Sequence, residues 1–311
     1  MTDRDDTAEL PAPPPSGSEG RAPKGASALV EVDLAAISHP GLVRRQNEDH
    51  FIATRFERSM RTLASNLPPG EVPADYAEAA FGYLVADGVG GSVAGELASR
   101  TAIHALMDLV LETPDWIMRL DRALAEEVLQ RMERRFQQVR DVLVARAKED
   151  PALRGMATTM TVACTLGHEV LTVHVGDSRA YVHRRNGRLE RLTRDQTLAQ
   201  SLADAGAIKQ EEVAHHPSRH VLTSALATRG AFVQVELKRS HLDDGDQLLL
   251  CSDGLTEMVS EKDIAAALQG SGSAASACRR LVDLALEAGG EDNVTVVTAR
   301  YRFPAPPARD G

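Results

Sequence analysis

The chain has 311 residues, 43% of them hydrophobic, and a formal net charge of −10 at pH 7. This size and apolar content suit one large core, and the negative charge argues against a nucleic-acid partner, which requires a clustered basic face. No stretch reaches the roughly 18 apolar residues of a membrane span, and the N-terminus lacks the basic start and apolar core of a signal peptide. The cysteines are odd in number and widely separated, which suits neither a zinc site nor a disulfide framework: Cys164, Cys251 and Cys278. We therefore expect a cytoplasmic protein that binds neither nucleic acid nor membrane.

Residues 1–28 are rich in Pro, Ala, Gly and charge and show no apolar periodicity, so we predict a disordered tail there. A second short disordered tail is predicted over residues 304–311. The residues between them, 29–303, are expected to form a single domain.

Short apolar runs, many of them rich in Val, Thr and Leu, predict β-strands. In chain order these runs are 29–37, 81–86, 158–166, 170–175, 180–183, 247–251 and 294–301. Apolar residues at helical spacing predict helices over 96–111, about 115–148, 197–205, 261–268 and 273–287. The segment 58–76 is predicted to be a surface loop. This order of strands and helices indicates a mixed architecture in which helices cover the sheets.

Four aspartates stand beside glycine or asparagine at the ends of predicted strands. Asp87, Asp177 and Asp253 each follow a strand, and Asp292 precedes the last one. A single Asp-Gly pair at a strand end is usually a turn, but four carboxylates that converge would repel one another strongly. A bound cation offsets that repulsion, and oxygen ligands favour Mg²⁺ or Mn²⁺ over zinc.

A fifth charged element lies in residues 41–49. Arg44 can hold phosphate oxygens with two hydrogen bonds, and Glu48 and Asp49 can orient waters or join a set of metal ligands. By itself such a segment is an ordinary charged surface turn. Together with the four aspartates it predicts a metal site that handles phosphate.

Six motifs, in this order, resemble those of the PP2C (PPM) family of metal-dependent protein serine/threonine phosphatases, in its bacterial form. They span most of the chain: 44–49, 85–91, 155–159, 175–179, 252–255 and 291–295. Each motif is moderately specific, and their joint order is highly specific. The resemblance implies an α+β fold, a four-layer α-β-β-α sandwich of two mostly antiparallel sheets flanked by helices.

The family pattern also implies roles for the first group of residues. Asp87 would bridge two metal ions, and Gly88 would ligate one of them through its backbone carbonyl. Asp253 and Asp292 would hold the first metal ion. The ions would be Mn²⁺ or Mg²⁺.

The remaining roles follow from the same resemblance. Glu48 and Asp49 would contact the second metal ion, largely through water. Many bacterial members hold a third ion, for which Asp177 with Asp253 are the matching candidates. Arg44 would bind the substrate phosphate.

The implied activity is hydrolysis of phosphoserine and phosphothreonine in proteins by a metal-activated water, without a phosphoenzyme. The implied partners are phosphoproteins and a cognate bacterial serine/threonine kinase that this enzyme would oppose. We expect a monomer.

The sequence departs from parts of the family. Val89 stands where many eukaryotic members have histidine. Residues 194–227 resemble the family's flap, but they read Ser224-Ala225-Leu226-Ala227 where many bacterial members have Arg before Ala-Leu-Gly. Three flap histidines, His215, His216 and His220, lack an accompanying carboxylate pattern, so we predict that they are solvated loop residues without a role.

Two other functional classes were considered. A nucleotide-binding module would need a third glycine where Val93 stands, and no G-x-x-x-x-G-K-[ST] sequence occurs. A catalytically silent PP2C-like regulator that binds phosphoproteins remains the alternative, although the full set of metal carboxylates argues against it.

Overall fold

The computed structural model describes residues 8–9, 30–64, 74–89, 92–112, 122–228 and 233–303. Two large sheets lie face to face at the centre, and every strand pair in them is antiparallel. The first sheet contains, in spatial order, β1 (Ala8–Glu9), β2 (Glu31–His39), β14 (Val294–Arg302), β13 (Gln247–Cys251), β9 (Arg179–His183) and β10 (Leu189–Arg191). The second contains β12 (Glu236–His241), β8 (Glu169–Val175), β7 (Met160–Leu166), β4 (Asp75–Ala86) and β3 (His50–Arg61). A small third sheet joins β11 (Leu226–Ala227), β6 (Ala157–Thr158) and β5 (Gly88–Val89).

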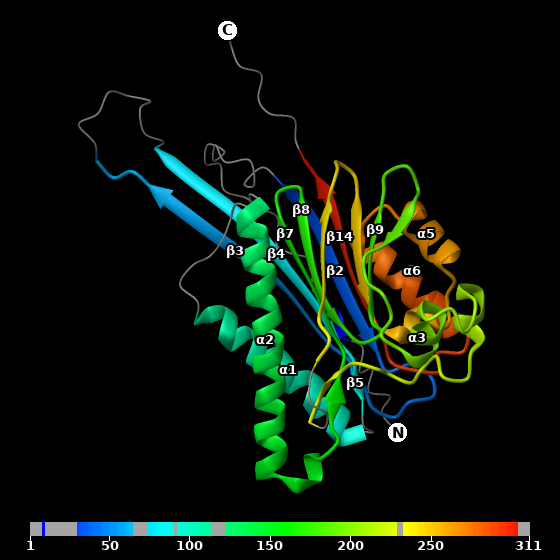
Figure 1. Ribbon diagram of the computed structural model, residues 1–311. Coiled ribbons are helices and arrows are strands. Elements are labelled where there is room, and N and C mark those ends of the chain that lie inside the picture. The colour runs from blue at the N-terminus through cyan, green and yellow to red at the C-terminus, as the bar shows by residue number, and fades with distance from the viewer. Residues whose placement is uncertain are drawn as a thin grey trace, which may run out of the picture.

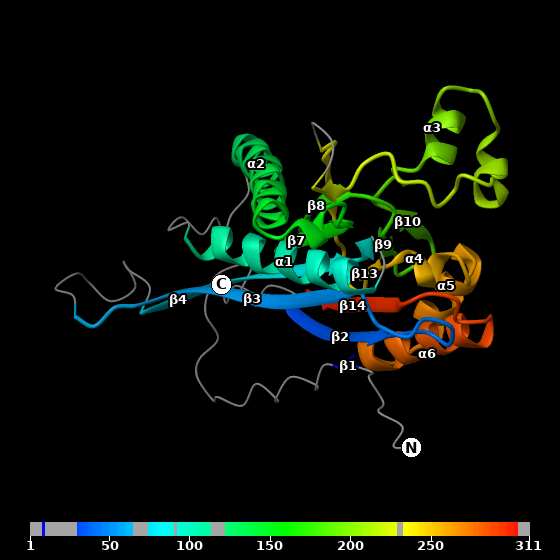
Figure 2. The ribbon, with the colours of Figure 1, turned by 90° about the horizontal axis from the view of Figure 1, so that it is seen from below.

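Helices cover the outer face of each large sheet, as Figures 1 and 2 show. The pair α1 (Ser92–Leu111) and α2 (Arg122–Glu149) packs on the second sheet, and the pair α5 (Glu261–Gly270) and α6 (Ala274–Glu287) packs on the first. Shorter helical segments are η1 (Pro151–Leu153), α3 (Leu198–Asp204), η2 (Gln210–His215) and α4 (Asp253–Thr256). The predicted four-layer sandwich is therefore confirmed.

Strand β13 shows why the central strands read as continuous apolar runs. Leu248 and Leu250 pack in the core between the two sheets, whereas Leu249 and Cys251 pack with α5 and α6. Successive side chains of a strand point to opposite faces, and both faces of this strand are covered. Apolar residues are therefore required at consecutive positions.

Side-chain caps explain where three of the helices begin. The hydroxyl oxygens of Thr197, Ser260 and Ser273 accept hydrogen bonds from backbone N–H groups in the first turns of α3, α5 and α6. These bonds satisfy donors that a helix leaves without an internal partner. The predicted starts of these helices lie within one residue of the observed ones.

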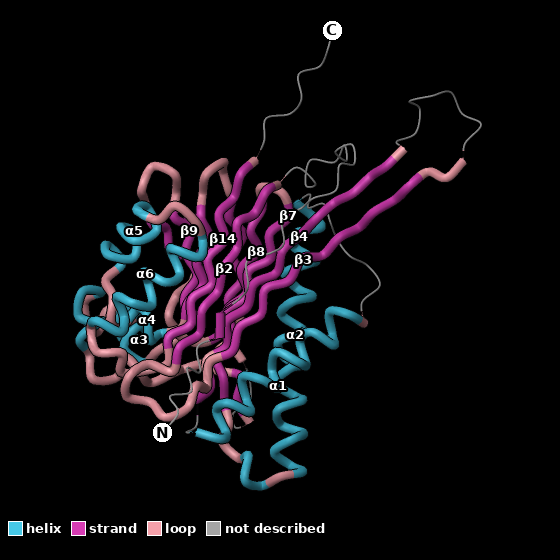
Figure 3. Tube along the Cα trace, turned by 180° about the vertical axis from the view of Figure 1, so that it is seen from behind, coloured by secondary structure: helices cyan, strands magenta, loops and turns pink. Residues whose placement is uncertain are grey.

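The prediction of a surface loop over 58–76 is wrong at both of its ends. Strand β3 continues to Arg61 and β4 already begins at Asp75, and these two residues face each other and form an ion pair at 2.9 Å. The resulting hairpin extends beyond the other strands (Figures 1 and 3). Its outer part is exposed and polar, so it lacks the apolar alternation by which strands are recognised. Residues 65–73 lie outside the described part.

The two predicted tails lie almost entirely outside the described residues. Of residues 1–28, only Ala8–Glu9 are described, and they pair with Ser38 and Ile37 at the edge of the first sheet. In the described part of the chain, none of the helices combines the length and apolarity that crossing a membrane would require.

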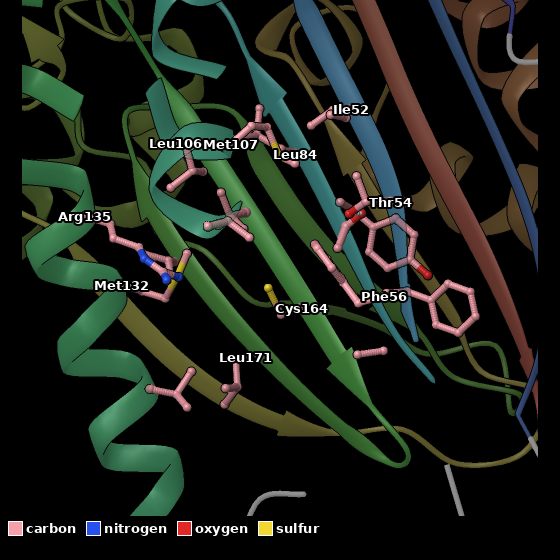
Figure 4. Close-up of a pocket in the computed structure, with 18 of the residues that line it drawn as sticks. Ile52, Thr54, Phe56, Leu84, Leu106, Met107, Met132, Arg135, Cys164 and Leu171 are labelled. Atoms are coloured by element: carbon pink, nitrogen blue, oxygen red, sulfur yellow. Dashed lines mark hydrogen bonds between the residues drawn. The ribbon is translucent and has the colours of Figure 1, made fainter. Parts of the chain in front are cut away.

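An apolar cavity lies between the second sheet and its helices (Figure 4). Met132 and Arg135 reach it from α2, and Cys164 and Leu171 reach it from β7 and β8. Burial raises the pKa of the Cys164 thiol to about 11, so this cysteine stays protonated near neutral pH. None of the described residues that line this cavity is a carboxylate.

Candidate active site

A second cavity, which we call the acidic cavity, opens where strands of both large sheets end. The four predicted aspartates come from different segments: Asp87 joins β4 to β5, Asp177 follows β8, Asp253 begins α4 after β13, and Asp292 precedes β14. The structure brings all four to this one cavity. Its described lining residues are Arg44, Glu48, Asp87, Gly88, Val89, Asp177, His220, Leu222, Asp253, Glu257, Glu291, Asp292 and Asn293.

Asp87 is positioned by the Thr158-Thr159 pair that the sequence analysis noted as a motif. The Asp87 backbone N–H donates to Thr159 Oγ1 at 3.0 Å, and the Asp87 carbonyl accepts from Thr158 Oγ1 at 2.8 Å and from the Thr159 N–H at 2.9 Å. These three bonds hold the end of β4. Gly88 follows because a Cβ there would lie 2.3 Å from the carbonyl oxygen of Gly95.

The segment 41–49 is fastened to the start of β14 by Asn293. The Asn293 amide nitrogen donates to the carbonyls of Pro40 and Gln46, both at 2.9 Å, and its Oδ1 accepts from the Glu48 N–H at 2.8 Å. Arg44 Nη2 donates to Asp292 Oδ2 at 2.6 Å. Asn293, to which no role had been assigned, therefore aligns Arg44 and Glu48 with the aspartates.

Glu48 and Asp49 occupy different environments. Glu48 lines the acidic cavity, whereas Asp49 is buried, with 4% of its surface exposed, and is not among the lining residues. Asp49 Oδ2 accepts a hydrogen bond from Ser252 Oγ at 2.7 Å, and burial is the main reason that the pKa of Asp49 rises to about 7.

The carboxylates of the acidic cavity destabilise one another's charged forms. Burial and then neighbouring carboxylates raise the pKa of Asp87 and of Asp177 well above the ordinary value, and the pKa of Asp253 is raised for the same reasons. Asp253 Oδ1 and Asp49 Oδ1 are buried and have no hydrogen-bond partner among the described residues. Carboxylate oxygens that lie close together and repel one another are suitable ligands for a hard divalent cation.

Besides Asn293, two residues of the cavity, His220 and Glu257, are functional candidates that the sequence did not predict. His220, predicted to be a loop histidine without a role, lines the acidic cavity, and its Nδ1 forms an ion pair with Glu257 Oε1. Burial, followed by the charge of Asp253, raises the pKa of Glu257 to about 7. Its spacing of four residues from Asp253 could have indicated that both side chains share one helical face.

His220 lies in residues 192–225, a segment that we call the excursion. It leaves the first sheet after β10 and ends at β11 in the small third sheet. Figure 2 shows its helix α3 standing away from the two sheets. Its two limbs are joined by a bridge between Thr197 and Leu222 and by backbone bonds from the Leu198 N–H to the Val221 carbonyl at 2.7 Å and from the Thr223 N–H to the Gln196 carbonyl at 2.8 Å. His216 Nδ1 accepts from the Ser218 N–H at 3.1 Å and is absent from the cavity lining.

The fold and this cavity define a class of protein. The family described as protein phosphatase 2C matches residues 74–286, and the chain belongs to this family. The resemblance inferred from the six motifs is therefore confirmed.

Individual relatives are more informative than the family match alone. The serine/threonine protein phosphatase PstP of Mycobacterium tuberculosis is 38% identical over 267 residues, which are 85% of this chain and 44% of the relative. This chain thus spans less than half the length of that protein. The serine/threonine phosphatase stp of Listeria welshimeri is 36% identical over 214 residues, 69% of this chain and 82% of the relative. A crystal structure of the catalytic domain of PstP in complex with two manganese ions matches with a TM-score of 0.66 and 33% identity, over 88% of this chain and 99% of that chain.

Proposed function

We propose that this protein is a metal-dependent protein phosphatase that hydrolyses phosphoserine and phosphothreonine. The observation that carries the proposal is the convergence of Asp87, Asp177, Asp253 and Asp292 on one cavity, where burial and mutual repulsion favour a bound cation. The names of the bacterial relatives support the same reaction.

The proposed metal ligands are the carboxylates of Asp87, Asp253 and Asp292, with the carbonyl of Gly88. Glu48 and Asp49 would act on a second ion largely through water, and Asp177 with Asp253 would serve a third. Mn²⁺ or Mg²⁺ suits these oxygen donors. When bound, such ions supply a water of lowered pKa and positive charge opposite the phosphoryl oxygens.

The protein's own groups would position the substrate. The Arg44 side chain is 54% exposed at the cavity and already engages a carboxylate oxygen of Asp292. A guanidinium offers two parallel N–H donors, a geometry that matches two phosphate oxygens. Arg44 would therefore orient the phosphoryl group, and Asn293 would keep the Arg44 segment in register with the aspartates.

The proposed substrates are phosphorylated proteins, and the proposed biological role is to oppose a serine/threonine kinase. We also propose that the protein acts as a monomer in the cytoplasm. The three cysteines, two of them buried, form no disulfide, which suits a reducing compartment.

The test is release of phosphate from a phosphothreonine peptide in Mn²⁺, in Mg²⁺ and in EDTA, for the wild type and for Asp253→Asn. Asp283→Asn, an exposed aspartate on α6, is the matched control. We expect turnover that requires metal and is lost in Asp253→Asn but kept in Asp283→Asn. Metal and phosphopeptide binding without any turnover by the wild type would refute the proposal in favour of a silent phosphoprotein-binding regulator.

A further inference from the structure

Three side chains at the edge of the acidic cavity bring potential ligand atoms together. One ligand atom from each of His220, Asp253 and Glu257 lies within 4.8 Å of the others, and this is the one such group that the described residues form. Asp177, the family's candidate for a third ion, is not part of it. The group therefore differs from the ligand set carried over from the family.

Two of these side chains come from a single helical turn. Asp253 is the first residue of α4 and Glu257 is its C-cap residue, so they are four positions apart and share a face. Both side chains are partly accessible to solvent at the acidic cavity. Asp253 Oδ1 is buried without a hydrogen-bond partner among the described residues. Two carboxylates face a single imidazole here, so the site has an excess of negative charge even when His220 is protonated.

The third side chain comes from the excursion between β10 and β11. The bonds between the limbs of the excursion hold Ser218, before His220, and Val221 and Leu222, after it. The imidazole is directed at Glu257, and its partly exposed position lets an ion enter from solvent. The contact between His220 and Glu257 therefore links the excursion to the wall of the acidic cavity that contains Asp253.

We propose that His220, Asp253 and Glu257 form a further cation site for a first-row transition-metal ion such as Mn²⁺. This inference rests on the proposed function, because Asp253 belongs to both ligand sets. One imidazole nitrogen with two carboxylate oxygens suits Mn²⁺ or a later transition metal better than Mg²⁺, which binds oxygen and retains its waters. Occupancy of the site fastens the excursion to the rim of the acidic cavity.

The test exploits the only nitrogen in the proposed ligand sets. Mn²⁺ bound to the full chain is counted by equilibrium dialysis, and ¹⁴N coupling to the bound Mn²⁺ is measured by pulsed electron paramagnetic resonance. The variants are His220→Ala and Glu257→Gln, and His215→Ala in the same excursion is the control. Asp177→Asn is compared to separate this site from the family's third site.

We expect the wild type and His215→Ala to show nitrogen coupling and to bind one more Mn²⁺ per chain than His220→Ala and Glu257→Gln. Excess Mg²⁺ should leave the nitrogen-coupled Mn²⁺ in place. Absence of nitrogen coupling in the wild type, or identical coupling in His220→Ala, would overturn the inference. So would loss of the extra Mn²⁺ in Asp177→Asn but not in His220→Ala. Phosphate release by the wild type is measured separately, so failure of the proposed phosphatase activity is distinguishable from failure of this site.

Discussion

The two cavities of this protein share strand β4 of the second sheet but have opposite chemistry. The apolar cavity beneath α1 and α2 is lined by side chains such as Leu84, Met132 and Leu171, without a carboxylate among its described lining residues. The acidic cavity lies where the strands end and collects carboxylates, several of them partly buried. Strand β4 contributes to the first through Leu84 and leads directly into the second at Asp87.

The apolar cavity belongs to the part of the molecule that stabilises the fold, whereas the acidic cavity contains the residues proposed to act on the substrate. Apolar burial between sheet and helix stabilises the folded state by about 25 cal/mol per Å². Buried carboxylates without a counter-ion do the opposite, because each must either keep a proton or hold its charge without water. Substitutions in the two regions should therefore affect stability and activity independently, and even with opposite signs.

The largest expected effect is on stability, at the apolar layer. Phe136 on α2 is fully buried among side chains of the second sheet and its helices, so Phe136→Ala should lower the free energy of unfolding by about 3–5 kcal/mol. Urea denaturation measures this change. The phosphatase rate of the folded fraction should stay within about twofold of wild type, and a large loss of rate at full folding would contradict the separation of the two regions.

Asp87→Asn should lower the activity and raise the stability of the metal-free protein. Loss of a carboxylate proposed to hold metal removes several kcal/mol of charge stabilisation, which corresponds to a fall in kcat of about 10²–10³-fold. In metal-free buffer the same variant should be more stable than the wild type, because a partly buried carboxyl with a strongly raised pKa is removed. Parallel rate measurements and denaturation curves test both signs, and decreased metal-free stability would count against the electrostatic argument.

Removal of metal should lower the free energy of unfolding of the wild type, because an ion that binds only the folded state stabilises it. At free Mn²⁺ of about 100 times its dissociation constant, binding adds about 2.7 kcal/mol, or about 5–10 °C in melting temperature. Thermal unfolding with Mn²⁺ and after dialysis against EDTA measures this shift. Asp283→Asn should respond like the wild type and Asp87→Asn should respond less; equal shifts in all three would place the bound ions elsewhere.

A further expected effect is a dependence of metal-free stability on pH. Asp49 has a pKa of about 7 in the folded protein, whereas an unfolded chain gives about 3.9. Below about pH 3 both states hold the proton; as the pH rises toward 7 the unfolded state loses it first, so the folded state loses stability by at most about 1.4 kcal/mol per pH unit. Glu257 contributes with the same sign, since its pKa is also raised to about 7. Urea midpoints across this range should fall with rising pH, and the fall should be shallower in Asp49→Asn.

Local sequence patterns predicted the buried strands and the capped helices well. Strands β13 and β14 are covered on both faces, so their sequences are unmistakably apolar, and the hydroxyl caps mark where α5 and α6 begin. Strand β3 and the edge strand β12 are absent from the predicted strands, and many of their side chains are partly exposed and polar. Backbone hydrogen bonds to neighbouring strands hold such strands in place, so their sequences need not show an alternation of apolar residues.

The sequence by itself determined the family and predicted the candidate site residues, because Asp-Gly turns at strand ends are local and their order along the chain is specific. Only the tertiary structure decided how those residues differ from one another. It buried Asp49 against Ser252 while leaving Glu48 on the cavity wall, and it made Asn293 the link between the two segments. It also placed His220 beside Glu257. These contacts join residues far apart in the chain, and they depend on how the two sheets and the excursion come together, which no local pattern of residues records.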